Sequence, residues 1–300
     1  MTIAITGSTG FIGMHLLAHL QREGYSFVAI VRPKTDVFVL TEKGVSVFVD
    51  HGSIEALKTF FLENRVKGVI HLATLFLKTH QPDQVHDLIE CNIEFGTRVL
   101  QAASQAKVNW FINTGTFWQH YQNREYSPVN LYAATKQAFE DIAQYYAETQ
   151  LIIVVTLKIN DTYGPKDTRP KIINIWKQLT DSNENLQMSG GEQLLDIVYI
   201  DDVTDAFVHL LKLLNENATI YNGKCYVLSS GVSISLKQLA GVFEKEIGKP
   251  LHIQWGAKPY QSREVMIPWQ KGIPLPGWEP KQSIEAGIRE ILESKYKEDK

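Results

Sequence analysis

The chain has 300 residues, of which 44% are hydrophobic and 21% are charged, and its formal net charge is −3. This composition is typical of a globular protein, and the absence of a basic tract argues against nucleic acid or an anionic membrane as a partner. No run approaches the ~18 apolar residues of a membrane span, and Cys91 and Cys225 fit neither a disulfide framework nor a metal site. We therefore expect no bound metal, and a cytoplasmic location because the apolar start also lacks the basic segment of a secretion signal.

A glycine-rich turn follows the apolar run at residues 3–5 and opens a segment with helical periodicity. Gly7 suits a tight turn, Gly10 leaves room for phosphates, and Gly13 lets the helix pack close to the strand. The N–H groups of such a turn and the positive end of the helix favour a pyrophosphate. The stretch predicts a dinucleotide site formed by Gly7, Thr9, Gly10, Phe11, Ile12 and Gly13. An ordinary turn that happens to contain glycines is the alternative.

The residues after the next two strands bear on which dinucleotide binds. The apolar run 27–31 ends at Arg32, where a fold that prefers NAD usually places an acid for the ribose 2′-hydroxyl. A guanidinium attracts a 2′-phosphate, so we predict NADP(H), with NAD as the alternative cofactor and a solvated loop as the alternative role for Arg32. Asp50 follows the strand at 45–49, where its carboxylate could accept a hydrogen bond from an adenine amino group or cap a helix.

Strands and helices continue to alternate through the first half of the chain. A helix at 54–64 leads to a strand at 68–73, a helical segment at 88–106 and a fifth strand at 110–112. This alternation predicts an α/β fold with a doubly wound parallel sheet, whose ligand lies beyond the carboxyl ends of the strands.

Three residues in the middle of the chain could carry chemistry. Thr114 follows the fifth strand, where a bound carbonyl could lie, and Tyr132 and Lys136 open the next helix. Residues four apart share a helix face, so the lysine ammonium could stabilise the phenolate and lower the tyrosine pKa for proton transfer. The spacing alone is weak, because Tyr296 and Lys300 have it too. The order of glycine turn, threonine, tyrosine and lysine carries the prediction.

This order resembles the extended short-chain dehydrogenase/reductase family, which includes nucleotide-sugar epimerases, dehydratases and 4-ketoreductases. Further matching stretches are His71-Leu72-Ala73-Thr74, Asn92, Tyr163-Gly164-Pro165 and residues 196–203. Within the family the chain is most similar to reductases of CDP-linked 3,6-dideoxy-4-hexuloses, as in O-antigen-type deoxysugar biosynthesis, through residues 113–114, 191–193, 256–260 and 264–266.

The resemblance implies a set of roles and a Rossmann fold. Tyr132 would be the general acid, Lys136 would hold the nicotinamide ribose and tune Tyr132, and Thr114 would hydrogen-bond the carbonyl. Leu72, Ala73 and Asn92 would join the cofactor site, and the substrate would contact Thr74, Thr116, Asp161, Lys171 and Arg263. Many relatives are homodimers, so we expect a homodimer as well.

The second half is predicted to form a smaller, discontinuous α/β substrate lobe. We assign residues 1–160 with 196–232 to the NADP-binding domain, and residues 161–195 with 233–300 to the substrate domain. Ser283 is a candidate cap of a final helix.

Several positions depart from the family pattern. Dehydratases carry an Asp-Glu pair after the catalytic Ser/Thr, where this chain has Gly115 and Thr116, which argues against a 4,6-dehydratase. An arginine that usually grips the diphosphate is replaced by Leu195, and Lys158 and Asp161 replace a common Arg and Asn.

The prediction from these observations is an NADPH-dependent reductase of the C4 keto group of a nucleotide-linked, CDP-like deoxyhexose. One alternative is a nucleotide-sugar 4-epimerase with tightly bound NAD. A second is a non-enzymatic NADP sensor of the same fold, since fold alone does not settle function.

Overall fold

The computed structural model describes residues 1–180 and 184–298, and its centre is a seven-stranded parallel sheet. The strand order is β11-β6-β5-β4-β1-β2-β3, and all neighbouring strands are parallel, which confirms the doubly wound parallel sheet predicted from the sequence. The strands are β1 (Thr2–Thr6), β2 (Ser26–Val31), β3 (Ser46–Val49), β4 (Val66–His71), β5 (Trp110–Thr116), β6 (Ile153–Ile159) and β11 (Lys224–Leu228).

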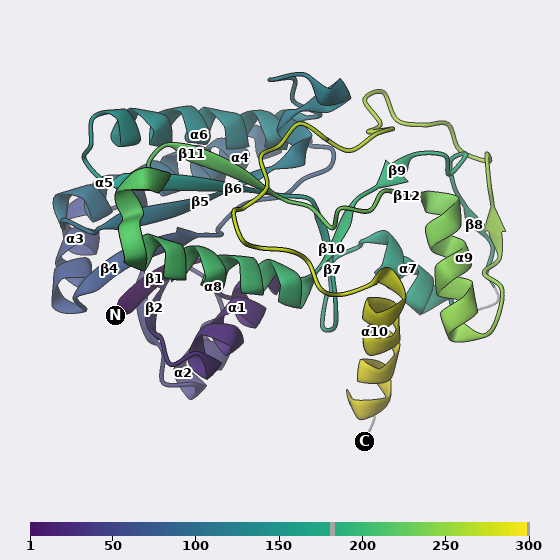
Figure 1. Cartoon of the computed structure of the whole chain (residues 1–300), viewed down its shortest axis with the longest axis horizontal. Coiled ribbons are helices and arrows are strands. Elements are labelled where there is room, and N and C mark those ends of the chain that lie inside the picture. Colours follow the sequence, from purple (N-terminus) through teal and green to yellow (C-terminus); the bar gives the residue numbers. More distant parts are fainter. Residues whose placement is uncertain (181–183, 299–300) are drawn as a thin grey trace.

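Helices cover both faces of this sheet (Figure 1). Leucines of α1 (Phe11–Arg22) and α8 (Ile200–Asn217) pack on one face, together with the short α2 (Phe38–Glu42). Residues of α3 (Ile54–Glu63), α5 (Phe95–Gln105) and α6 (Leu131–Glu148) pack on the other face. Because both faces are covered, β5 is buried along its whole length, and its apolar residues alternate between the two cores.

A second group of elements lies beside the carboxyl ends of the central strands, to the right in Figure 1. Its buried side chains form a core of their own, built mainly from α7 (Ile172–Leu179), α9 (Leu236–Ile247) and α10 (Ile284–Glu298). Short strands complete it, and they are β7 (Asp161–Tyr163), β8 (Leu186–Gln187), β9 (Leu194–Leu195), β10 (Ile197–Tyr199), β12 (Ile234–Ser235) and β13 (Ile253–Gln254). The Ser283 hydroxyl accepts a hydrogen bond from the Ala286 N–H, as predicted for the cap of the last helix.

Two local differences from the predicted elements matter for the site. β5 runs on to Thr116 instead of ending at Ile112, so the threonines expected in a loop belong to the strand. The helical segment expected from residue 88 begins as α4 (Val85–Ile89), passes through a π-helical turn at 90–94 and continues as α5. Within the described residues, no helix is both long and apolar enough to span a membrane.

Candidate active site

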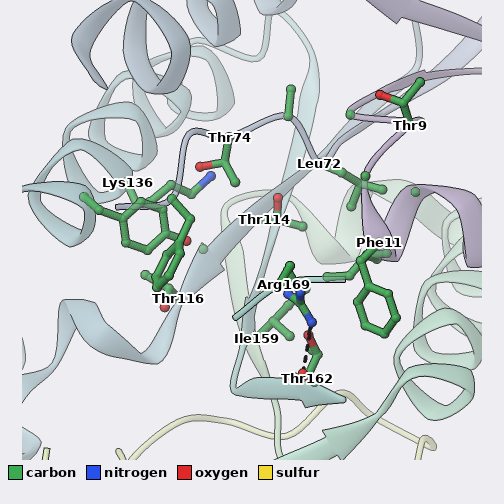
Figure 2. Close-up of a pocket in the computed structure, with 18 of the residues that line it drawn as sticks. Thr9, Phe11, Leu72, Thr74, Thr114, Thr116, Lys136, Ile159, Thr162 and Arg169 are labelled. Carbon is green, nitrogen blue, oxygen red and sulfur yellow. Dashed lines mark hydrogen bonds between the residues drawn. The ribbon is translucent and has the colours of Figure 1, made fainter. Parts of the chain in front are cut away.

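A cavity of about 360 Å³ lies where the two groups of elements meet, beyond the carboxyl ends of β1, β4 and β5. Figure 2 shows side chains from both groups around it, with Thr9 and Phe11 at one end and Lys136 and Thr116 at the other. The predicted residues among its lining are Gly7, Thr9, Gly10, Phe11, Ile12, Gly13, Arg32, Leu72, Ala73, Thr74, Thr114, Thr116, Tyr132, Lys136, Asp161 and Lys171.

The glycine turn is shaped to hold a phosphate-bearing group. Gly7 has φ +69°, which favours glycine, and a Cβ on Gly13 would come within 2.2 Å of the Gly7 carbonyl oxygen. α1 begins after Gly10 without a side-chain cap, so its first N–H groups remain available to an anion. The turn therefore fits the pyrophosphate of a dinucleotide.

The charged side chains that line the cavity are mostly cationic. Four of them are basic and one is acidic among the described lining residues, namely Arg32, Lys136, Arg169, Lys171 and Asp161. The Lys171 ammonium donates to Asp161 at 2.7 Å, and the Arg169 guanidinium donates to Asp167 at 2.7 Å and lies 4.4 Å from the centroid of the Phe11 ring. Figure 2 also shows Arg169 bonded to Thr162, which places this guanidinium between the glycine turn and β7. The excess of positive charge suits a ligand with several phosphates.

Tyr132 lies in the first turn of α6, where Asn130 caps the helix by accepting a hydrogen bond from the Ala133 N–H at 3.0 Å. Burial raises the pKa of its phenol to about 12, although the nearby hydroxyls of Thr116 and Thr74 lower that pKa in part. The phenol is therefore neutral near pH 7. The sequence predicted that Lys136 lowers this pKa, but the loss of water around the buried phenol raises it instead.

Lys136 lies one turn further along the same face and is 2% exposed. Burial lowers the pKa of its ammonium to about 8, while the carboxylate of Glu140 acts in the opposite direction. In Figure 2 its amine points into the cavity on the side of Thr74. An ammonium that is costly to bury and faces a ligand cavity is typical of a functional site.

The two threonines of β5 have different partners. The Thr114 hydroxyl donates to the backbone carbonyl of His71 at 2.5 Å, whereas the Thr116 hydroxyl is near enough to Tyr132 to lower the pKa of its phenol. Both face the same side of the strand, since side chains alternate, but Thr116 is nearer its end. The structure thus places Thr116, rather than Thr114, beside the Tyr132 hydroxyl.

Three predicted site residues do not line the cavity, and each has other contacts. Asp50 is buried and its carboxylate accepts from Arg98 at 2.8 Å. Arg263 is exposed, lies 4.2 Å from the centroid of the Tyr121 ring and donates to the Ser127 hydroxyl at 2.8 Å.

Asn92, the third, joins two segments of the site. Its carbonyl oxygen accepts from the Thr74 hydroxyl at 3.0 Å, and its amide donates to the Thr135 hydroxyl at 3.0 Å. It thereby fixes the loop after β4 against α6, and places Thr74 where its hydroxyl reaches Tyr132.

Sequence reasoning missed the aromatic side of the cavity. Phe76 and Trp118 line it, and their ring centroids lie 5.0 and 6.5 Å from that of Tyr132. Both residues follow strands at the carboxyl edge of the sheet, which was the signal that could have identified them.

Comparison with known proteins is consistent with this geometry. The model of the NAD dependent epimerase/dehydratase family matches residues 3–222. The chain is 29% identical to CDP-abequose synthase of Salmonella muenchen over 299 residues, which cover 98% of this chain and 97% of the relative. It is 27% identical to CDP-abequose synthase of Salmonella typhimurium over 298 residues, with 97% of each chain covered.

Solved structures share the fold. UDP-glucose 4-epimerase of Thermus thermophilus, in complex with NAD, superposes with a TM-score of 0.79 at 23% identity, covering 98% of both chains. UDP-glucose-4-epimerase of Stenotrophomonas maltophila, with bound NAD and a formylated UDP-arabinopyranose, reaches 0.86 at 17% identity, covering 100% of this chain and 99% of the other.

Proposed function

The chain belongs to the NAD dependent epimerase/dehydratase family, and we propose that it reduces the C4 keto group of a nucleotide-linked deoxyhexose with NADPH. The observation that carries the proposal is the neutral, buried phenol of Tyr132 in a cationic cavity, flanked by Thr74, Thr116 and Lys136. The likeness to CDP-abequose synthases over nearly the full chain supports a CDP-linked sugar as substrate.

We infer the roles of the site residues from their positions around the cavity. A reduced nicotinamide supplies a hydride to the carbonyl carbon when it is bound in the cavity. Tyr132 donates its proton to the carbonyl oxygen, because its side chain lines the cavity and its phenol is protonated at the start of the reaction. Lys136, whose buried amine faces the cavity, would hold the nicotinamide ribose, as the family resemblance implies.

We assign the hydrogen bond to the carbonyl oxygen to Thr116, because its hydroxyl lies beside that of Tyr132. Thr114 instead holds the end of β4 through His71, and its predicted catalytic role stays a prediction. Dehydratases carry an Asp-Glu pair directly after the catalytic Ser/Thr. In this chain Gly115 and Thr116 follow Thr114, and Phe117 and Trp118 follow Thr116, so neither threonine is followed by a carboxylate.

Arg32 supports NADPH as the cofactor. Its side chain is exposed at the end of β2 and lines the cavity, where a guanidinium attracts a 2′-phosphate. The carboxylate of Asp50 is bonded to Arg98, so it does not offset the charge of Arg32.

The aromatic side of the cavity supports a deoxygenated sugar. A buried hydroxyl needs a hydrogen-bond partner, whereas a carbon that has lost its hydroxyl can pack on an aromatic ring without that cost. Phe76 and Trp118 offer such rings next to Tyr132. The cations of the cavity, Arg169 and Lys171 included, would contact the diphosphate in place of the arginine that Leu195 replaces.

The test is a panel of CDP-, dTDP-, GDP- and UDP-linked 4-keto sugars, with loss of NADPH absorbance as the readout. We expect turnover by the native chain and loss of turnover in Tyr132→Phe, which keeps the ring but lacks the proton. Undiminished turnover in that variant would refute the role of Tyr132.

Identification of the nucleotide released on denaturation separates this proposal from a 4-epimerase. Stoichiometric bound NAD without NADPH turnover would favour the epimerase. Binding of NADPH without turnover of any sugar in the panel would favour a sensor.

A further inference from the structure

A buried polar network lies behind the candidate active site, on the side of β5 away from the cavity's glycine turn. It joins Gln119, Glu140 and Lys158, which come from the turn after β5, from α6 and from β6. Gln119 is 0% exposed and Lys158 is 4% exposed, and none of the three belongs to the binding and proton-transfer groups of the proposed reaction. Figure 1 shows β5, β6 and α6 packed together in this region.

The first link of the network is to the backbone of Thr116. β4 pairs with β5 only as far as Asn113, so the last residues of β5 lack that neighbour. The Thr116 N–H donates to the side-chain carbonyl of Gln119 at 2.9 Å. The Gln119 carboxamide thus holds the residue whose hydroxyl meets Tyr132.

The second link fixes the carboxamide itself. Both of its N–H groups are used, because Gln119 donates to Glu140 at 2.7 Å and to Gln137 at 2.6 Å. Its orientation is therefore determined, with the oxygen facing Thr116 and the nitrogen facing α6.

The third link balances the charge of Glu140. The Lys158 ammonium lies 3.1 Å from one carboxylate oxygen, while the other oxygen accepts from Gln119. Lys158 also contacts the Nε2 atom of His120 at 2.8 Å, and the His120 ring stacks on Trp269. A buried ion pair whose remaining groups are hydrogen-bonded makes a defined support, whereas a broken one leaves an uncompensated charge.

Gly115 shows how closely the network approaches the strand. A Cβ at this position would lie 2.8 Å from Cγ of Lys158 and 2.9 Å from the side-chain oxygen of Gln119. The glycine between the two threonines of β5 therefore leaves the space that both side chains occupy.

We propose that Gln119, held in place by Glu140 and Lys158, is a positioning residue that sets the Thr116 hydroxyl against Tyr132. Tyr132, Lys136 and Glu140 follow one another at four-residue spacing on α6, so one helix face carries both the proton donor and the carboxylate that anchors Gln119. The network thus fixes β5 and α6 relative to each other at the reacting groups. This inference rests on the reductase function proposed above.

The main test exchanges the two functional groups. Gln119→Glu places a carboxylate against that of Glu140. Glu140→Gln places an amide nitrogen against either the amide nitrogen of Gln119 or the ammonium of Lys158. Each single variant therefore breaks the chain of hydrogen bonds. The double variant restores the links to Thr116 and Lys158 at the same net charge, because the carboxylate introduced at position 119 accepts from the Thr116 N–H, while the amide introduced at position 140 donates to that carboxylate and accepts from Lys158. The Gln137 amide, which accepts from Gln119 in the native chain, has to turn over so that its nitrogen faces the new carboxylate. We expect each single variant to lose about 10- to 100-fold in kcat with little change in KM, and the double variant to recover most of it.

A second readout does not depend on catalysis. In Gln119→Leu the Thr116 amide loses its acceptor, so its hydrogen exchange should accelerate about tenfold or more while the amides in the middle of α6 stay protected. Gln144→Leu is the matched control, because Gln144 lies on the same helix but pairs with Glu148 at the surface.

The outcomes distinguish the two proposals. A double variant no more active than the weaker single variant, or a Thr116 amide that stays protected in Gln119→Leu, would overturn the positioning role. If the native chain reduces no sugar in the panel, the reductase proposal fails, and the exchange of the Thr116 amide alone decides whether Gln119 holds that residue.

Discussion

Lys136 should destabilise the protein that carries it, and the size of the effect can be worked out from its burial. The ammonium is 2% exposed, and its pKa falls from 10.5 in the unfolded chain to about 8 in the folded protein. Each pKa unit corresponds to ~1.4 kcal/mol, so the charged lysine lowers the free energy of unfolding by roughly 3–4 kcal/mol. Lys136→Met removes the charge at similar volume, and should therefore be more stable than the native chain near pH 7 while losing the function proposed for this residue.

The sign of the pH dependence follows from linkage. Below pH 8 the lysine is protonated in both states and the whole penalty applies. Between pH 8 and 10.5 the unfolded chain binds more protons, so the stability of the native chain rises relative to that of Lys136→Met, and above this range the penalty is gone. The measurement is urea unfolding of both cofactor-free proteins at several pH values across this window.

Lys158→Met is the matched control, because Lys158 is also buried but is paired with Glu140. Its removal leaves the carboxylate without its partner and should cost roughly 1–3 kcal/mol instead of stabilising the protein. A stability difference between Lys136→Met and the native chain that does not change with pH would refute the reasoning, since it would show that the Lys136 charge is not desolvated.

Three further predictions concern single residues. Thr116→Val should lower kcat about 100-fold while Thr114→Val changes it only a few-fold, as measured by NADPH oxidation with an active sugar; equal losses would contradict the assignment. Gly13→Ala should destabilise the protein by roughly 1–3 kcal/mol in urea unfolding, because its Cβ would be about 1 Å too close to a backbone oxygen. Gly241→Ala is the control, because it has open space in α9 and should stabilise the protein by roughly 0.5–1 kcal/mol. Arg32→Asp should raise the Kd of NADPH about 10- to 100-fold and leave that of NADH nearly unchanged, as followed by nucleotide fluorescence; parallel losses would argue against contact with a 2′-phosphate.

Local patterns gave the parts of the site whose residues are close in sequence. The glycine turn lies within eight residues, and its requirements for a positive φ and close packing are visible in the chain itself. Tyr132 and Lys136 are four apart on one helix, so helical geometry alone predicted that they share a face. The alternation of strands and helices likewise predicted the parallel sheet, which the structure confirms.

Contacts between distant residues were not predictable in this way. The partner of Asp50 is Arg98, which lies 48 residues away in the chain, and Asn92 joins Thr74 to Thr135. The threonine nearest Tyr132 depended on where β5 ends, which is decided by pairing with β6 as far as Ile159 and not by the residues of β5 alone. In the same way, the pKa of Tyr132 depends on how deeply the surrounding segments bury it.

The sequence by itself therefore determined the parallel sheet, the phosphate-binding turn and the helix that carries the tyrosine and lysine, because each follows from a pattern of residues that are near one another in the chain. Only the tertiary structure decided which hydroxyl meets the phenol, which charges face the ligand and how the carboxamide of Gln119 supports β5. These depend on where separate segments meet and on how much water their contact excludes, and neither quantity is encoded in any one stretch of the chain.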